Sequence, residues 1–404
     1  MKTSLATILL LLLLFSCQTE KKTDTEIHTE ILTLDTHIDI ALKFVRDSTY
    51  KFSERHTYLQ DETRTDLPRM HDGGLDAAIF AVWTPQKDRT QLGNSEAKIK
   101  ALKIIATIEK NIAETNNAII AKSTNEFYKI ITQNKTAILM GMENGYPIGN
   151  NIAEVQNFYN RGIRYITLCH TLDNDICDSS TDETEDEGLS NFGIEVIKEM
   201  NRLGIIVDVS HISDSAFYQV MRVTKTPVIA SHSNARALCS HPRNMTDNMI
   251  KLLAKNGGVI SINFYEDYLL DMRIDTVLTS KQIASFNKKW AHLKTTKNGK
   301  KEYDRLLFAT KHKPPIPPEV TLNDVINHID YVVKLVGINH VGIGSDFDGG
   351  GGITGLEDVS KMGNITSELL KRGYSQKDIQ KIWSGNFLRV FKEVEDYAST
   401  KDEI

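Results

Sequence analysis

The sequence of 404 residues lacks the features that mark several common classes of protein. Its net charge is only −5 and it contains no basic tract, so nothing in it indicates binding to nucleic acid. Its four cysteines include no C-x-x-C pair, which argues against a structural zinc site of that kind. No short sequence repeat stands out. Since 40% of the residues are apolar and 25% are charged, we expect a soluble globular protein.

The sequence also lacks a long apolar run at its N-terminus. The run at residues 8–15 is too short to span a bilayer as a helix. It is followed by "LFSC", so the segment resembles a bacterial lipoprotein signal, and we predict that residues 1–17 are removed or processed with Cys17 lipidated. The polar residues 18–30 are then a flexible tether. The prediction places the chain at the bacterial cell envelope, facing the periplasm or on the cell surface, and held to the membrane through a lipid anchor only.

One alternative remains open for the N-terminal segment. It could be an ordinary secretory signal with an incidental cysteine, although no A-x-A-like cleavage site is obvious nearby.

The remaining cysteines leave a second question open. Cys169, Cys177 and Cys239 cannot all pair internally because their number is odd. Cys169 and Cys177 could form a disulfide in an oxidising compartment, which the sequence does not decide.

Short β-rich runs alternate with helical patterns along the chain. Eight runs are predicted strands: 31–35, 77–83, 137–143, 165–170, 205–211, 228–233, 259–264 and 341–346. Their near-continuous Val, Ile and Leu suits strands of a parallel sheet buried on both faces. Helical patterns lie between them: 93–122, 151–162, 191–204, 214–223, 246–258 and 321–337. The alternation predicts an α/β fold, a (β/α)8 TIM-type barrel over residues 31–398 with a long insertion, 265–320, after the seventh strand.

An open doubly wound sheet is the alternative fold. It is weakened because no glycine-rich phosphate loop follows the first strand.

Ionisable side chains stand where the predicted strands end. The segment "ILTLDTHIDIAL" places Asp35, His37 and Asp39 at alternate positions, which point to one face of a strand. The other strand ends carry Glu143, His170, His211, His232 and Asp346. In a barrel these ends meet at one rim, and unpaired ionisable groups are costly to bury. We therefore predict that this set binds metal, with Asp35 as a hydrogen-bonding support.

The ligand types narrow the choice of metal. Imidazole with carboxylate suits zinc, with manganese, iron or cobalt as alternatives. Three histidines and two carboxylates exceed what one tetrahedral zinc with an open position needs. Two metals about 3.5–4 Å apart, sharing a carboxylate, would use them all, and such a pair polarises a carbonyl and ionises a bridging water near neutral pH.

The ordered motifs resemble the membrane (renal) dipeptidase family, a branch of the amidohydrolase-like metal-dependent barrels. The similarity runs from about residue 31 to residue 390, through "DTHIDIAL", "TDLPRMHDGGLDAAIFAVW", "MENGYPIG", "RYITLCHTLDN", "IIVDVSHISDSAF", "PVIASHSNARAL", "HPRNMTD" and "HVGIGSDFDG". The resemblance implies a zinc-dependent dipeptidase that hydrolyses small dipeptides and tolerates a D-residue at their C-terminal position. It also suggests a homodimer.

The resemblance further implies two Zn²⁺ ions per chain, held by His37, Asp39, Glu143, His211 and His232. His37 and Asp39 bind one ion, His211 and His232 bind the other, and Glu143 bridges the two. A hydroxide that bridges the ions would attack the peptide carbonyl.

Three further residues receive roles from the resemblance. His170 contacts the substrate and stabilises the oxyanion, Arg243 clamps the terminal carboxylate, and Asp346 handles proton transfer. Arg243 suits this role physically, because a guanidinium can capture a carboxylate with two parallel hydrogen bonds.

Two features depart from the family pattern. Asn144 stands after Glu143 where the family has glycine, and the insertion is longer than in mammalian members. Two other functions stay open. One is a different hydrolase on the same scaffold, such as a lactonase, a deaminase or an N-acyl amino acid hydrolase. The other is a non-catalytic envelope lipoprotein that binds a ligand.

Overall fold

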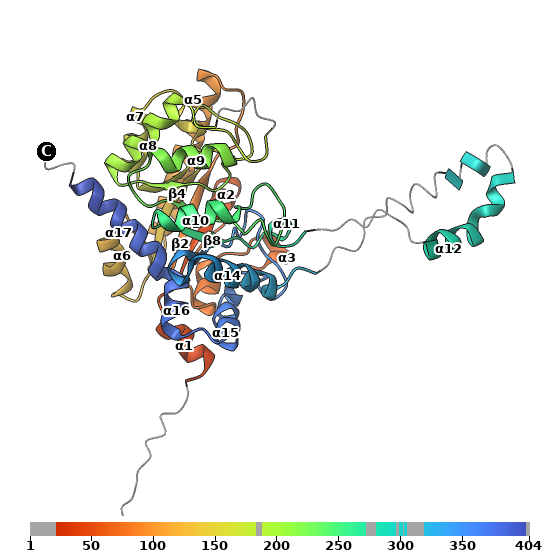
Figure 1. Cartoon of the computed structure of the whole chain (residues 1–404). Helices are drawn as coiled ribbons and strands as arrows, with labels where there is room; N and C mark the ends of the chain where they lie inside the picture. The colour runs from red at the N-terminus through yellow and green to blue at the C-terminus, as the bar shows by residue number, and fades with distance from the viewer. Residues whose placement is uncertain are drawn as a thin grey trace, which may run out of the picture.

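The structure is a computed structural model, and it describes residues 22–182, 188–271, 280–295, 299–301, 303–304 and 319–400 (Figure 1). The predicted signal segment with Cys17 and the first residues of the predicted tether lie outside this part of the chain. Among the described residues, no helix is both long enough and apolar enough to cross a membrane.

Eight parallel strands form a nearly closed barrel. Around the barrel they are β1 (Leu34–Ile38), β2 (Ala77–Trp83), β4 (Thr136–Glu143), β5 (Ile163–Thr167), β6 (Ile206–Asp208), β7 (Ile229–Ala230), β8 (Val259–Ile262) and β9 (Val341–Ile343). The amide of Asp346 donates to the carbonyl oxygen of His37 at 3.0 Å, and the amide of Asp39 donates to that of Phe347 at 2.8 Å. These bonds join the ends of β9 and β1, so the predicted (β/α)8 TIM-type barrel is confirmed.

One strand was not predicted. The short β3 (Ala118–Ile120) falls within the helical pattern expected over 93–122, whereas the helix there ends at Ala113. β3 pairs with the first residues of β4, and β5 pairs with the last ones. Three residues are too few to show a strand periodicity, so β3 could not be recognised from the sequence pattern.

Helices surround the barrel (Figure 1). They are α1 (Asp24–Glu30), α2 (Ala41–Arg46), α3 (Tyr58–Asp61), α4 (Leu67–Asp72), α5 (Gln91–Ala113), α6 (Thr124–Ile131), α7 (Ala153–Asn160), α8 (Asn191–Leu203), α9 (Asp214–Val223), α10 (Asp247–Lys255), α11 (Glu266–Leu269), α12 (Ser280–Trp290), α14 (Leu322–Val336), α15 (Gly363–Lys371), α16 (Gln376–Gln380) and α17 (Asn386–Ser399). Shorter helical turns are η1 (Tyr146–Ile148), η2 (Ala291–Thr295), η3 (Ile338–His340), η4 (Val359–Lys361) and η5 (Lys381–Gly385). Thr246 and Thr321 cap α10 and α14, as their positions before these helices suggest.

Apolar side chains fill the barrel below its rim. Leu34, Ile79 and Leu139 from the strands belong to one buried cluster with Phe387 and Phe391 of α17. Every second residue of a strand points into the barrel, so Glu143 shares the inward face of Leu139. This apolar cluster therefore fills the bottom of the barrel, and the ionisable residues occupy the opposite end.

Residues 24–30 differ from the flexible tether expected at 18–30. They form α1, in which Thr23 and Glu26 make a reciprocal capping box. His28 is buried, with Nδ1 2.7 Å from Thr366 Oγ1 and Nε2 2.8 Å from the carbonyl oxygen of Gly73. The expectation of a flexible chain is wrong for this stretch, because a capped helix anchored by a buried histidine packs on the barrel.

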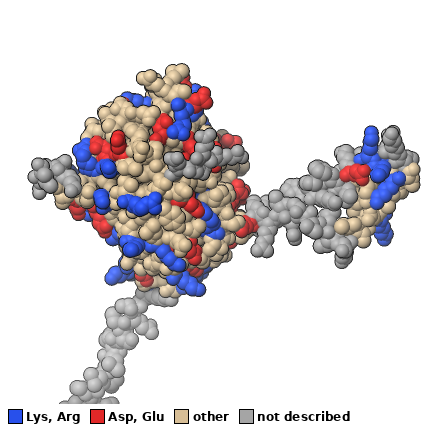
Figure 2. Space-filling model, turned by 45° about the horizontal axis from the view of Figure 1, so that its top comes forward, with Lys and Arg blue, Asp and Glu red and all other residues tan. Residues whose placement is uncertain are grey.

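The insertion at 265–320 follows β8, which is the seventh strand of the barrel. Its described residues include α11, α12 and η2, and Tyr265 and Tyr268 lie at its start. On the face of the molecule seen in Figure 2, acidic and basic side chains are interspersed over the barrel.

Candidate metal centre

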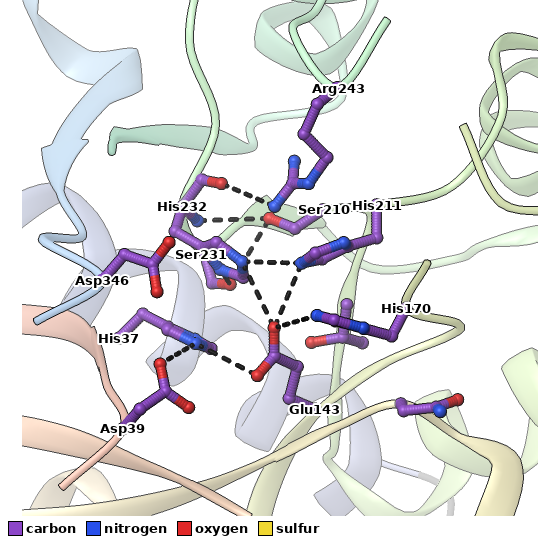
Figure 3. Close-up of polar contacts among 12 residues, drawn as sticks. His37, Asp39, Glu143, His170, Ser210, His211, Ser231, His232, Arg243 and Asp346 are labelled. Atoms are coloured by element: carbon purple, nitrogen blue, oxygen red, sulfur yellow. Dashed lines mark hydrogen bonds and ion pairs between the residues drawn. The ribbon is translucent and has the colours of Figure 1, made fainter. Parts of the chain in front are cut away.

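The structure brings the ionisable residues of the strand ends together at the mouth of the barrel (Figure 3). They lie at or just after the ends of β1, β4, β5, β6, β7 and β9, and they are His37, Asp39, Glu143, His170, His211, His232 and Asp346. Their nitrogen and oxygen atoms form three overlapping groups within 4.8 Å: His37, Glu143 and His232; Glu143, His170 and His211; His37, Asp39 and Asp346. Barrel closure therefore gathers residues that lie more than 300 positions apart in the sequence.

Glu143 lies between two sets of imidazoles, and each of its oxygens faces a different set. Oε2 is 3.5 Å from Nε2 of His37, which is itself 3.4 Å from Oδ2 of Asp39. Oε1 is 3.1 Å from Nε2 of His211 and 3.5 Å from Nε2 of His232. A carboxylate placed in this way can share its two oxygens between two cations.

Hydrogen bonds fix the orientation of two of the histidines. The hydroxyl of Tyr165 donates to the carbonyl oxygen of Thr36, so its oxygen accepts from Nδ1 of His37 at 2.8 Å. The hydroxyl of Ser231 donates to Oδ2 of Asp208 at 2.6 Å, so its oxygen accepts from Nδ1 of His232 at 2.8 Å. Each bond leaves the Nε2 lone pair directed at the centre, as metal ligation requires.

Local electrostatics suit the same role. Burial lowers the pKa of His211 and of His232 well below the ordinary value, and the nearby charge of Arg243 adds to this effect in both. Burial opposes ionisation of Glu143, but the surrounding histidines outweigh it and hold its pKa well below the usual range. His211 and His232 are thus neutral and Glu143 is ionised, which are the states in which these groups bind metals. His37 differs, because Tyr165, Glu143 and Asp39 outweigh its burial and raise its pKa well above the ordinary value, so it releases a proton when a metal binds.

Buried ring nitrogens without hydrogen-bond partners are a second observation that fits a metal centre. Nε2 of His37 is buried without a hydrogen-bond partner, although it faces two carboxylates. Nδ1 of His211 also has none. Buried polar atoms normally have a hydrogen-bond partner or a bound ion. A cation held between His37 and the two carboxylates would provide Nε2 of His37 with such a partner. Imidazole and carboxylate together match zinc, and also the other divalent metals considered above.

His170 and Asp346 stand close enough to the centre to be ligands themselves. Nε2 of His170 is 3.5 Å from Oε1 of Glu143. Asp346 accepts a hydrogen bond from the side-chain amide of Asn263 at 3.0 Å, and burial together with Asp39 raises its pKa well above the usual range. Asp35 behaves as the support that was expected, because its carboxylate accepts from the amides of His37 and Ser345, both at 3.0 Å.

Arg243 is more enclosed than a simple carboxylate clamp. Its side chain is buried, and its guanidinium donates to Ser233 Oγ at 2.7 Å and to the carbonyl oxygen of His232 at 2.9 Å. Its Nε has no hydrogen-bond partner. The guanidinium carbon lies 5.7 Å from the ring centre of Tyr268, which lines the mouth.

A cavity of about 380 Å³ opens above the centre. Besides the residues of the centre, its wall includes Leu42, Arg46, Trp83, Tyr265 and Tyr268. Reasoning from the sequence did not assign these five to the site. Their only signal was position, since each ends or follows a predicted strand on the side where the mouth had to lie.

Backbone strain is concentrated at the same place. Among the described non-glycine residues with positive φ are Asn144 at 82°, His211 at 72°, Asp346 at 60° and Asp348 at 66°. Such conformations persist where the surrounding structure enforces them, and they cluster at functional sites.

The described cysteines are thiols. Cys169, Cys177 and Cys239 are all buried and unbridged, and burial together with Cys169 raises the pKa of Cys177.

A parallel barrel with imidazoles and carboxylates converging on its C-terminal mouth defines a metal-dependent enzyme of the amidohydrolase-like class. The comparison with protein families identifies the branch. Residues 21–404 match the model of the membrane dipeptidases, peptidase family M19. The chain belongs to this family, whose members are metallopeptidases.

Relatives support the assignment. The chain is 30% identical to dipeptidase aclJ of Aspergillus oryzae, over 92% of this chain and 80% of that protein. It is 34% identical to dipeptidase tcpJ of Claviceps purpurea, over 70% of this chain but only 56% of that longer protein. The crystal structure of the probable dipeptidase PvdM from Pseudomonas aeruginosa superimposes with a TM-score of 0.78 at 31% identity, covering 93% of this chain and 98% of that one.

Proposed function

We propose that the protein is a binuclear zinc dipeptidase that hydrolyses the peptide bond of small dipeptides. The observation that carries the proposal is the position of Glu143, whose two oxygens face His37 on one side and His211 and His232 on the other. One zinc with an open position needs three protein ligands, whereas this arrangement offers five, one of which is a carboxylate that two ions could share. His37 and Asp39 would hold one ion, and His211 and His232 the other.

When bound, the ion pair would supply an activated water nucleophile and would polarise the scissile carbonyl. The residues of the chain do the rest. His170 stands beside Glu143 at the edge of the cavity, where it can donate a hydrogen bond to the oxyanion. Asp346 takes up a proton and passes it to the leaving amine.

Arg243 would place the substrate. Its positive charge is buried behind Tyr268, and in this structure its Nε has no hydrogen-bond partner. We propose that it attracts the terminal carboxylate of the dipeptide and so sets which end of the substrate lies on this side of the mouth.

Further properties belong to the same proposal. Tolerance of a D-residue at the C-terminal position, a lipid anchor on Cys17 at the bacterial cell envelope, and a homodimer are all proposed from the sequence. The predicted signal segment that supports the anchor is outside the described residues.

The experiment that tests the function combines a metal titration with a substrate panel. Chelator-treated protein should be inactive and should regain hydrolysis of L,L and L,D dipeptides as two equivalents of Zn²⁺ are added. Glu143→Ala should lower the zinc content, because both ions lose a ligand. Turnover of lactones, deaminase substrates or N-acyl amino acids in place of dipeptides would instead favour another hydrolase on this scaffold. Purified protein with neither zinc nor turnover would favour a ligand-binding lipoprotein.

A further inference from the structure

Two basic residues lie on the side of the barrel mouth opposite Arg243, one on the wall of the cavity and the other next to it. Around the barrel, β4, β5 and β6 separate β2 from β7 on one side, and β8, β9 and β1 separate them on the other. β2 and β7 are therefore opposite one another. Arg243 lies in the segment after β7, next to Tyr268 of the cavity wall, while Trp83 ends β2 and lines the cavity.

The two residues are Arg46 and Lys100. Arg46 is the last residue of α2, and it is the one Lys or Arg among the described residues that line the cavity, as Trp83 also does. Lys100 lies on α5, the helix that follows β2, and its Nζ is 5.2 Å from the ring centre of Trp83. The helices α2 and α5 pack against each other, and the charge of Arg46 adds to burial in lowering the pKa of Lys100.

Among the described residues, no carboxylate forms an ion pair with Arg46 or with Lys100. By contrast, Lys98 on the same helix pairs with Glu154 at 2.6 Å. Two neighbouring positive charges at a mouth, without a carboxylate between them, attract an anion.

We infer that Arg46 and Lys100 select dipeptides with an acidic side chain on the N-terminal residue. The inference rests on the proposed function, in which Arg243 attracts the terminal carboxylate. A dipeptide held in that direction across the centre extends its N-terminal residue toward β2. There Trp83 contacts the aliphatic part of the side chain, and the two cations receive its carboxylate.

Among the other described residues that line the cavity there is no further Lys or Arg to receive an acidic side chain. Asp39 and Glu143 would be occupied by the metal ions, and Asp346 and Asp348 are themselves acids. An acidic side chain gains only at the side of Arg46 and Lys100. A side-chain carboxylate on the C-terminal residue of the dipeptide would gain nothing from Arg46 and Lys100.

The test compares two substrates that differ only in charge, Glu-Ala and Gln-Ala. With the zinc-loaded enzyme, kcat/KM should favour Glu-Ala by roughly tenfold, and added salt should reduce the preference because the cations are accessible to solvent. The variant Arg46→Gln/Lys100→Gln should hydrolyse both substrates at similar rates. Its turnover of Gln-Ala should stay near that of the wild type, which shows that it is folded.

A matched control comes from the same helix. Lys110→Gln removes the same charge about 15 Å further along α5 and should keep the preference. An equal rate on both substrates in the wild type, or a preference that survives the double substitution, would overturn the inference while leaving the dipeptidase function in place. Hydrolysis of neither substrate would overturn both.

Discussion

At the scale of single residues, the centre is built from side chains that face one another across the mouth of the barrel. His37, Glu143 and His232 form one group of candidate ligands, and Glu143 also belongs to a second group with His211. Arg243 lies next to them in a loop that folds back, where Ser233 and the backbone of His232 accept hydrogen bonds from its guanidinium.

Asn144 illustrates how a departure from a family pattern can be accommodated. It follows Glu143 with φ at 82°, a conformation that favours glycine, and asparagine is among the residues that best tolerate it. Its side-chain oxygen accepts from the amide of Tyr146 and from the side chain of Asn174, both at 3.1 Å. These two hydrogen bonds hold Asn144 in the backbone conformation that a glycine would adopt more easily.

The role of Asp346 can be tested by one substitution. Asp346→Asn keeps the size of the side chain and its contact with Asn263 but removes the group that accepts a proton. We expect zinc content near that of the wild type and turnover reduced on the order of 10²-fold or more. Full turnover would remove Asp346 from proton transfer, and loss of one ion would show that it is a ligand, as its position beside His37 and Asp39 allows.

The hydrogen bonds behind the histidines give a second prediction. Tyr165→Phe removes the acceptor of His37, and Ser231→Ala removes the acceptor of His232. Each should weaken zinc binding by roughly 10- to 100-fold, because the ring loses the partner that fixes its orientation. Stepwise zinc titration by calorimetry should show that each variant weakens a different ion. Two variants that weaken the same ion, or neither, would contradict the assignment of His37 and His232 to separate ions.

At the scale of elements, the predictions were good for long periodic segments and poor for short ones. The eight barrel strands were predicted, whereas β3 was hidden in a helical pattern because it has only three residues. The helix α1 was taken for a tether because its composition is polar, although a capping box and the buried His28 hold it in place. Local composition therefore misleads where a few tertiary contacts decide the structure.

A buried histidine on α14 links three elements and makes their packing sensitive to pH. The amide of Ala235 donates to Nδ1 of His328 at 3.1 Å, and Nε2 lies 2.9 Å from the carbonyl oxygen of Leu269, to which it donates. The neutral ring can satisfy both contacts at once, because Nδ1 accepts one hydrogen bond and Nε2 donates the other. Burial lowers the pKa of His328 below its ordinary value of 6.5, so the unfolded state binds this proton more readily than the folded one.

The stability that His328 provides is therefore complete above about pH 6.5 and is lost as the pH falls below that value. His328→Gln can keep both hydrogen bonds but does not titrate. We expect the free energy of unfolding, measured in denaturant, to fall with pH less steeply in this variant, by up to about 1.4 kcal/mol per pH unit. Parallel curves for the two proteins from pH 5 to 7 would show that His328 does not contribute.

At the scale of the whole molecule, the alternation of strands and helices was enough to predict the barrel, and barrel closure was enough to predict where the centre lies. The same alternation says little about the walls of the mouth, which are built from α2, α11 and the loops after the strands. The proposed substrate preference depends on those walls, and the positions of Arg46 and Lys100 near the mouth became visible only in the structure.

The central claim is that strand ends distant in sequence hold two metal ions on either side of Glu143. The most direct measurement is an anomalous difference map from crystals of the zinc-loaded protein, collected at the zinc absorption edge. We predict two peaks about 3.5–4 Å apart. One should lie beside His37 and Asp39, the other beside His211 and His232, with Glu143 between them. A single peak, or peaks away from Glu143, would contradict the claim.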